Sequence, residues 1–220
     1  MNKIKELSSY LELGSHVADI VEHTLTLPEP KLILPTGSTP LSLYKELVNR
    51  QLDWSTTTTF NLDEYVINPN HPQSYRSFMK KHLFDRIDIY PNNCNFPDRN
   101  TQAYEDIIPE VDLCILGIGS NGHIAFNEPG SSFDSVTRVV DLDKQTIEDN
   151  SRFFDSIDDV PTQAITMGLK TIMKSKKIVL MANGEHKLNI LNIAMNGEIT
   201  ESVPASILQK HKNVKVYYCD

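Results

Sequence analysis

A glycine-rich stretch in the middle of the chain carries two side chains that could transfer protons. Residues 116–132 read LGIGSNGHIAFNEPGSS, in which His123 and Glu128 follow a G-x-G-x-x-G pattern. That pattern can bind a dinucleotide, but its third glycine then opens a long helix. Here a Pro-Gly pair interrupts the chain within eight residues of the third glycine. The stretch therefore predicts an active-site loop that carries an imidazole and a carboxylate.

Two other segments suit an anion. Residues 35–40 (PTGSTP) form a hydroxyl-rich turn before a predicted helix, whose free N–H groups and dipole attract negative charge. The turn lacks the lysine and spacing of a nucleotide P-loop, which favours a single small phosphate. Lys187 opens a later predicted helix, where a cation opposes the helix dipole unless it binds an anion. Ordinary helix capping explains the turn equally well when it is taken alone.

Asp63 follows a predicted strand and completes a set of groups for proton transfer. An aldose–ketose rearrangement needs a base next to a carbonyl and an acid/base of near-neutral pKa to open a sugar ring. Asp63 and His123 supply both, although an aspartate at a strand end can simply cap a turn and a lone histidine is more often structural. Together with the anion-binding segments, they predict chemistry on a small phosphorylated metabolite.

The elements that must position these residues alternate between helix and strand. Helical spacing predicts helices over residues 10–25, after Thr39 as N-cap, and over 74–87. Short apolar runs predict strands over 31–34, 57–62, 111–116, 164–167, 177–181 and 214–218. This order predicts an α/β, doubly wound, Rossmann-like fold with a mostly parallel sheet covered by helices on both faces. Ligands of such sheets bind beyond the carboxyl ends of the strands, where the loops described above begin.

Composition excludes several classes of protein. The length of 220 residues and 40% hydrophobic content predict one domain over residues 1–220. A net charge of -8 without clustered Lys and Arg disfavours nucleic-acid binding. No apolar run is long enough to span a membrane and the N-terminus lacks a signal-peptide core, so we expect no membrane partner and a cytoplasmic location. Three unevenly spaced cysteines predict reduced thiols and no zinc site.

Ordered motifs along nearly the whole chain resemble one family. These are LPTGSTPLSLYKEL, FNLDEYV, SYRSFM, LGIGSNGHIAFNEPGSS, the Thr-Arg pair at 137–138, NSRFFD and SVPASILQKH. With them, the chain resembles the glucosamine-6-phosphate deaminases, within a superfamily that includes the 6-phosphogluconolactonases. The resemblance implies conversion of glucosamine 6-phosphate and water to fructose 6-phosphate and ammonia, without a metal or an organic cofactor.

The resemblance also implies a role for individual residues. Asp63 is the base that moves a proton between C2 and C1 of the open-chain sugar, and His123 acts in ring opening with Glu128 orienting it. The residues implied for the substrate phosphate are Gly37, Ser38, Thr39, Arg152 and Lys187.

The chain departs from the family pattern beside the histidine. Many members have aspartate where this chain has Asn121, although other members resemble it in having asparagine. Asparagine can still hold an imidazole through a hydrogen bond but cannot stabilise imidazolium as an anion would. We therefore expect His123 to lose its proton more easily than it would beside aspartate. The deamination should persist with a shifted pH profile.

A second departure concerns regulation. Longer members resemble this chain up to its last strand and then continue into an extension that contributes to an activator site between subunits, whereas this sequence stops at Asp220. Arg138 matches an effector-contacting position, but Val140 and Asp141 replace a basic and a hydroxyl residue. We expect no activation by amino-sugar phosphates, and a monomer rather than a hexamer.

Three other functions are compatible with parts of the sequence. A 6-phosphogluconolactonase resembles G-H-x-A-S-L-F-P after the turn, whereas this chain reads GHIAFNEP. A non-catalytic sugar-phosphate sensor would keep the anion site but lose Asp63, His123 and Glu128. An NAD-binding oxidoreductase rests on the glycines alone. The lactonase and the sensor stay open as alternatives at this stage.

Overall fold

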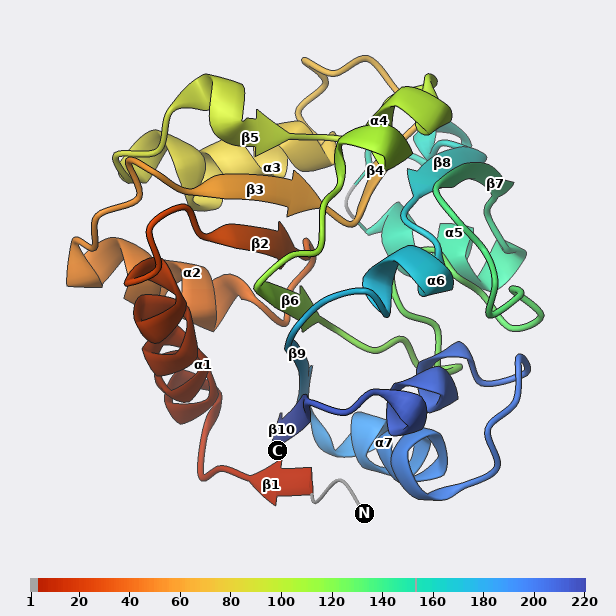
Figure 1. Cartoon of the computed structure of the whole chain (residues 1–220). Coiled ribbons are helices and arrows are strands. Elements are labelled where there is room, and N and C mark those ends of the chain that lie inside the picture. Colours follow the sequence, from red (N-terminus) through yellow and green to blue (C-terminus); the bar gives the residue numbers. More distant parts are fainter. Residues whose placement is uncertain (1–3, 153) are drawn as a thin grey trace.

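A parallel sheet forms the centre of the computed structural model, which describes residues 4–152 and 154–220 (Figure 1). Its seven strands run in the order β1-β10-β9-β6-β2-β3-β5, and every neighbouring pair is parallel. The strands are β1 (Ile4–Glu6), β2 (Lys31–Leu34), β3 (Thr58–Asn61), β5 (Cys94–Asn95), β6 (Leu113–Leu116), β9 (Ile178–Asn183) and β10 (Val214–Cys219). The predicted α/β fold with a mostly parallel sheet is confirmed.

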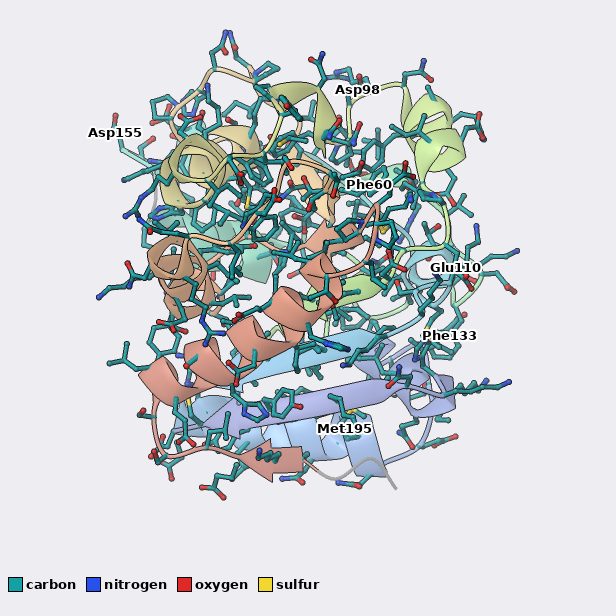
Figure 2. All side chains as sticks on the ribbon, turned by 60° about the vertical axis from the view of Figure 1, so that its left-hand side comes forward. Phe60, Asp98, Glu110, Phe133, Asp155 and Met195 are labelled. Atoms are coloured by element: carbon teal, nitrogen blue, oxygen red, sulfur yellow. The ribbon has the colours of Figure 1, made fainter. Side chains whose placement is uncertain are left out.

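Helices cover both faces of this sheet because successive strand residues point to opposite sides. Leu32 and Leu34 belong to one apolar cluster, whereas Ile33 belongs to the other. The first face is covered by α1 (Tyr10–Leu25), α2 (Leu41–Arg50) and α3 (Tyr75–His82), and the second by α4 (Thr101–Ile107), α6 (Leu169–Ile172) and α7 (Leu188–Asn196). Figure 2 shows α1 lying across the first face and Phe60 among the buried side chains. The doubly wound arrangement is thereby confirmed.

A second, antiparallel sheet corrects two sequence predictions. It consists of β4 (Asp63–Tyr65), β8 (Gln163–Thr166) and β7 (Arg138–Asp141), with β8 in the middle. Residues 164–167 therefore do not join the main sheet, and the strand predicted over 57–62 ends earlier. The chain changes sheets at Leu62, whose N–H bonds to β2 while its carbonyl accepts the N–H of Met167. A short apolar run looks the same in either sheet, so the sequence could not separate them.

Two helix boundaries also differ from the prediction. Pro40, not Thr39, occupies the N-cap position of α2, and its side chain provides no capping hydrogen bond. The Tyr10 hydroxyl instead accepts the Ser42 N–H at 3.0 Å. α3 ends at His82 rather than near residue 87, because Leu83 leaves helical geometry before a short 3-10 turn. The predicted bounds of α1 and β2 are confirmed. None of the described helices is long and apolar enough to cross a membrane.

Candidate active site

A cavity of about 750 Å³ opens at the carboxyl ends of the central strands. Its walls come from the segments that follow β2, β6 and β9, and from β4. β2 and β6 are neighbours in the sheet. The chain continues from β2 to β3, on the side of β2 away from β6, whereas β9 lies on the side of β6 away from β2. Crevices form where the loops of a parallel sheet diverge in this way. The cavity thus lies at the edge of the sheet where the sequence predicts the site.

Asp63 brings a buried carboxyl group to the cavity wall. Only 7% of the residue is exposed, and among the described residues no side chain or backbone group donates a hydrogen bond to its carboxyl. Burial, followed by the nearby Glu64 carboxylate, raises the pKa of Asp63 to about 8. A carboxyl group with this pKa exchanges its proton readily near neutral pH, as a general base or acid must.

Glu64 has a different task from its neighbour, because adjacent strand residues point to opposite faces. Its carboxylate accepts the backbone N–H groups of Tyr65, Tyr75 and Arg76 at 2.7 to 2.9 Å. It thereby caps the first turn of α3, which lines the cavity. Burial raises the pKa of Glu64, and these hydrogen bonds oppose that rise. Glu64 therefore fixes the position of α3 relative to β4.

His123 lies in the glycine loop after β6, with its ring at the cavity wall. Its side chain is 27% exposed, and Nδ1 lies 3.4 Å from Glu128 Oε2, which is long for a hydrogen bond. The backbone N–H of Gly119 donates to the His123 carbonyl at 2.9 Å, so the loop closes on itself. This closure holds the imidazole between the cavity and the Glu128 carboxylate.

Glu128 lies behind His123 and is not part of the cavity wall. Burial opposes its ionisation, but contacts with His123, Thr146 and Asn121 prevail and lower the pKa of Glu128 to about 2. Asn121 Nδ2 donates to Oε2 at 2.7 Å, and Thr146 Oγ1 donates to Oε1 at 2.6 Å. The carboxylate is therefore ionised at neutral pH and can orient the imidazole.

The Asn121 side chain corrects one expectation. Its amide does not hold the imidazole ring: Nδ2 binds Glu128, and Oδ1 accepts the backbone N–H of His123 at 3.1 Å. Asn121 thus acts on the ring through the carboxylate and the backbone.

Asn127 and Arg138 support the glycine loop through hydrogen bonds, and the sequence patterns did not single them out for this role. The Asn127 side chain is fully buried and donates to the carbonyls of Ile124 and Met167. Its Oδ1 accepts from Arg138 at 2.9 Å. Ala125, between the two functional side chains, has a φ of 52°. A non-glycine residue in this region is strained and needs such support.

The hydroxyl-rich turn after β2 forms another part of the cavity wall. Gly37 has a φ of 93°, which favours glycine. Two tyrosines hold the turn from behind: Tyr10 donates to the Ser38 carbonyl and Tyr44 to the Pro35 carbonyl, each at 2.5 Å. These tyrosines lie on α1 and α2 and had no recognisable signal in the sequence.

Lys187 and Arg152 reach the same cavity from two further segments. Lys187 ends a 3-10 turn (Glu185–Lys187) and occupies the N-cap position of α7, which agrees with the prediction of a cation at a helix start. Arg152 follows α5 (Lys144–Ser151) directly. The predicted residues that line this one cavity are Gly37, Ser38, Thr39, Asp63, His123, Arg152 and Lys187.

Aromatic rings cover another wall of the cavity, and no sequence pattern indicates this role for them. The Tyr75 ring stacks on Phe126 with ring centroids 5.9 Å apart, and Tyr65 packs against both. This wall is an apolar surface with hydroxyl groups. In residues 4–152 and 154–220, no group of three or more His, Cys, Asp or Glu side chains is placed to hold a metal ion.

The chain is similar to known proteins along most of its length. Residues 10–217 match the family model described as glucosamine-6-phosphate isomerases/6-phosphogluconolactonase. The chain is 47% identical to a glucosamine-6-phosphate deaminase from Mycoplasma mycoides subsp. mycoides, over 97% of this chain and 93% of the relative. It is 46% identical to a glucosamine-6-phosphate deaminase from Clostridium novyi, over 96% and 95% of the two chains.

Solved structures are similar over almost the full length. A protein described as a monomeric glucosamine-6-phosphate deaminase superposes with a TM-score of 0.95 at 39% identity, covering 99% of this chain and 97% of that one. A 6-phosphogluconolactonase from Thermotoga maritima superposes with a TM-score of 0.79 at 22% identity, over 98% of each chain. The second similarity concerns the fold alone.

Proposed function

The chain belongs to the family of glucosamine-6-phosphate isomerases and 6-phosphogluconolactonases, and from this membership we propose that it is a glucosamine-6-phosphate deaminase. It converts glucosamine 6-phosphate and water to fructose 6-phosphate and ammonia. The observation that carries the proposal is the Asp63 carboxyl, which faces the cavity with a pKa of about 8. The ionised fraction of this carboxyl, which grows as the pH rises toward 8, is a strong enough base to remove a proton next to a carbonyl.

The substrate phosphate binds at the turn after β2. Backbone N–H groups near Gly37, Ser38 and Thr39 and the start of α2 offer hydrogen-bond donors, and Arg152 and Lys187 add two positive charges from other segments. This arrangement fixes one end of the sugar, so that its reacting carbons lie beside Asp63 and His123.

His123 opens the sugar ring by moving a proton between the C1 hydroxyl and the ring oxygen. The ionised Glu128 behind the imidazole stabilises the positive charge that develops when the ring takes up this proton. The open chain presents an aldehyde at C1 and an amine at C2.

Asp63 then transfers a proton between these carbons. Removal of the C2 proton by Asp63, with uptake of a proton by the C1 oxygen, gives an enolamine. Return of the Asp63 proton to C1 and loss of one proton from the amine nitrogen then give an imine at C2, so that the proton gained by oxygen is balanced by the one lost from nitrogen. Water adds to this imine and ammonia leaves, which yields the ketone of fructose 6-phosphate. Asp63 ends the cycle in the protonation state in which it began.

We also infer that residues 1–220 function as one domain and as a monomer. The pairing of β1, near the start of the chain, with β10, near its end, supports the single domain. The similar solved protein described as monomeric supports the monomer. Sedimentation of the purified chain tests the second inference, and a hexamer would contradict it.

The decisive experiment incubates the purified protein with glucosamine 6-phosphate and measures ammonia and fructose 6-phosphate together. We expect equal amounts of both products from the wild-type chain and neither from Asp63→Asn. A parallel reaction with 6-phosphogluconolactone tests the lactonase alternative. Folded protein that hydrolyses the lactone but releases no ammonia would overturn the proposal.

A further inference from the structure

The two oxygens of the Glu128 carboxylate have separate partners. Oε2 faces His123 Nδ1 and accepts from Asn121, whereas Oε1 accepts from Thr146 Oγ1 at 2.6 Å. Thr146 lies on α5, is only 6% exposed and lines the cavity. The hydroxyl of Thr146 therefore fixes the end of the carboxylate that is turned away from the imidazole.

α5 connects this hydrogen bond to the proposed phosphate site. Six residues after Thr146, directly beyond the end of the helix, Arg152 lines the same cavity. The helix is anchored beside the small sheet by Leu142, which is buried, and by Ile147, which packs against the same apolar cluster. One short helix thus carries both the Glu128 contact and the approach to the phosphate.

We propose that Thr146 is a positioning residue for the acid/base pair of His123 and Glu128. Through Thr146, α5 links the part of the site that holds Arg152 to the part that transfers protons. The inference rests on the proposed deaminase function. It adds a residue of α5 to the groups that set the orientation of the carboxylate.

The Thr146 hydroxyl restricts rotation of the Glu128 carboxylate. His123 and Asn121 both contact Oε2, so they leave the carboxylate free to turn about that oxygen. The Thr146 hydroxyl, held on a helix, removes this freedom because it binds the other oxygen. A donor that stabilises the ionised form also keeps the carboxyl acidic.

The test compares Thr146→Val, which keeps the size and branching of the side chain but has no hydroxyl, with Thr146→Ser, which keeps the hydroxyl. Loss of one hydrogen bond to a charged group corresponds to a decrease in kcat of about tenfold for Thr146→Val. We expect KM for glucosamine 6-phosphate to change less than about twofold and Thr146→Ser to retain kcat within about twofold. Carbon NMR of the Glu128 carboxyl should show that it titrates at higher pH in Thr146→Val than in the wild type.

Three results would overturn the inference. One is an unchanged kcat and Glu128 titration in Thr146→Val, and another is an equal loss of kcat in both variants. The third is a rise in KM with kcat unchanged, which would indicate movement of α5 rather than of the carboxylate. If the wild-type chain releases no ammonia, the proposed function fails, but the Glu128 titration still tests the contact with Thr146.

Discussion

The imidazole of His123 occupies the space that a side chain on residue 119 would need. A β-carbon built on Gly119 would lie 2.2 Å from His123 Cε1 and 2.3 Å from Nδ1, far inside van der Waals contact. The middle glycine of the G-x-G-x-x-G pattern is therefore required by the histidine that follows it. Because the ring packs directly on the backbone of Gly119, it cannot shift toward that residue.

Gly119→Ala should lower kcat by about 100-fold, since displacement of a reacting group by about 1 Å has an effect of this size. The added methyl group must displace the ring of His123 from its present position beside Glu128. Gly117→Ala is the matched control, because a β-carbon at Gly117 meets no atom within 4 Å. Steady-state kinetics with both variants decide the point, and equal losses in the two would refute the packing argument.

Asp63→Asn should abolish exchange of the C2 proton of the substrate with solvent while phosphate binding remains nearly intact. The amide keeps the size of the carboxyl but cannot accept the proton. Proton NMR in heavy water measures the exchange. Persistent exchange at a comparable rate would assign the base to another residue.

The same variant should change how stability depends on pH. The folded wild type holds the Asp63 proton up to about pH 8, whereas the unfolded chain releases it near the usual carboxyl pKa of 3.8. A raised folded pKa means that the stability contributed by this group is complete at acidic pH and is lost as pH rises toward 8. The margin between the free energies of unfolding of Asp63→Asn and of the wild type should therefore shift in favour of the variant between about pH 4 and about pH 8. Urea unfolding at several pH values measures the margin, and a constant margin would contradict the burial argument.

Asn121→Asp should alter the pH profile more than the substrate affinity. The substitution replaces the Nδ2 donor, 2.7 Å from Glu128 Oε2, by a second carboxylate. Two carboxylates at this separation share a proton, so one of them titrates at a raised pH. We expect the acidic limb of kcat/KM to move to higher pH with KM changed less than about threefold. An unchanged profile would count against the role given to Asn121.

Glu64→Gln should destabilise the protein by about 2 kcal/mol, because one carboxylate oxygen that accepts backbone N–H groups becomes an amide donor. Thermal unfolding measures the loss. The position of α3 depends on this cap, so KM should rise in the folded variant as well. Glu198→Gln, at an exposed position, is a matched control for the loss of a carboxylate elsewhere. An equal loss of stability in the two variants would show that capping of α3 by Glu64 is unimportant.

The sequence by itself determined the fold class and most of the residues of the candidate site. Apolar strands with helical runs between them are local patterns, and they predicted the parallel sheet and the bounds of α1 and β2. Parallel strands bring their carboxyl ends to one edge, so residue types in the following loops predicted a shared site. Seven of the nine predicted residues line the cavity, and Asn121 and Glu128 lie behind His123.

Only the tertiary structure decided which partner each polar group takes. Asp63 and Glu64 are adjacent carboxylates in the sequence, but the strand pleat sends one to the cavity and the other to the start of α3. The contacts of Tyr10 with the Ser38 carbonyl and of Thr146 with Glu128 join residues 28 and 18 positions apart. Such contacts depend on how helices and loops pack, and neither periodicity nor motif spacing encodes them.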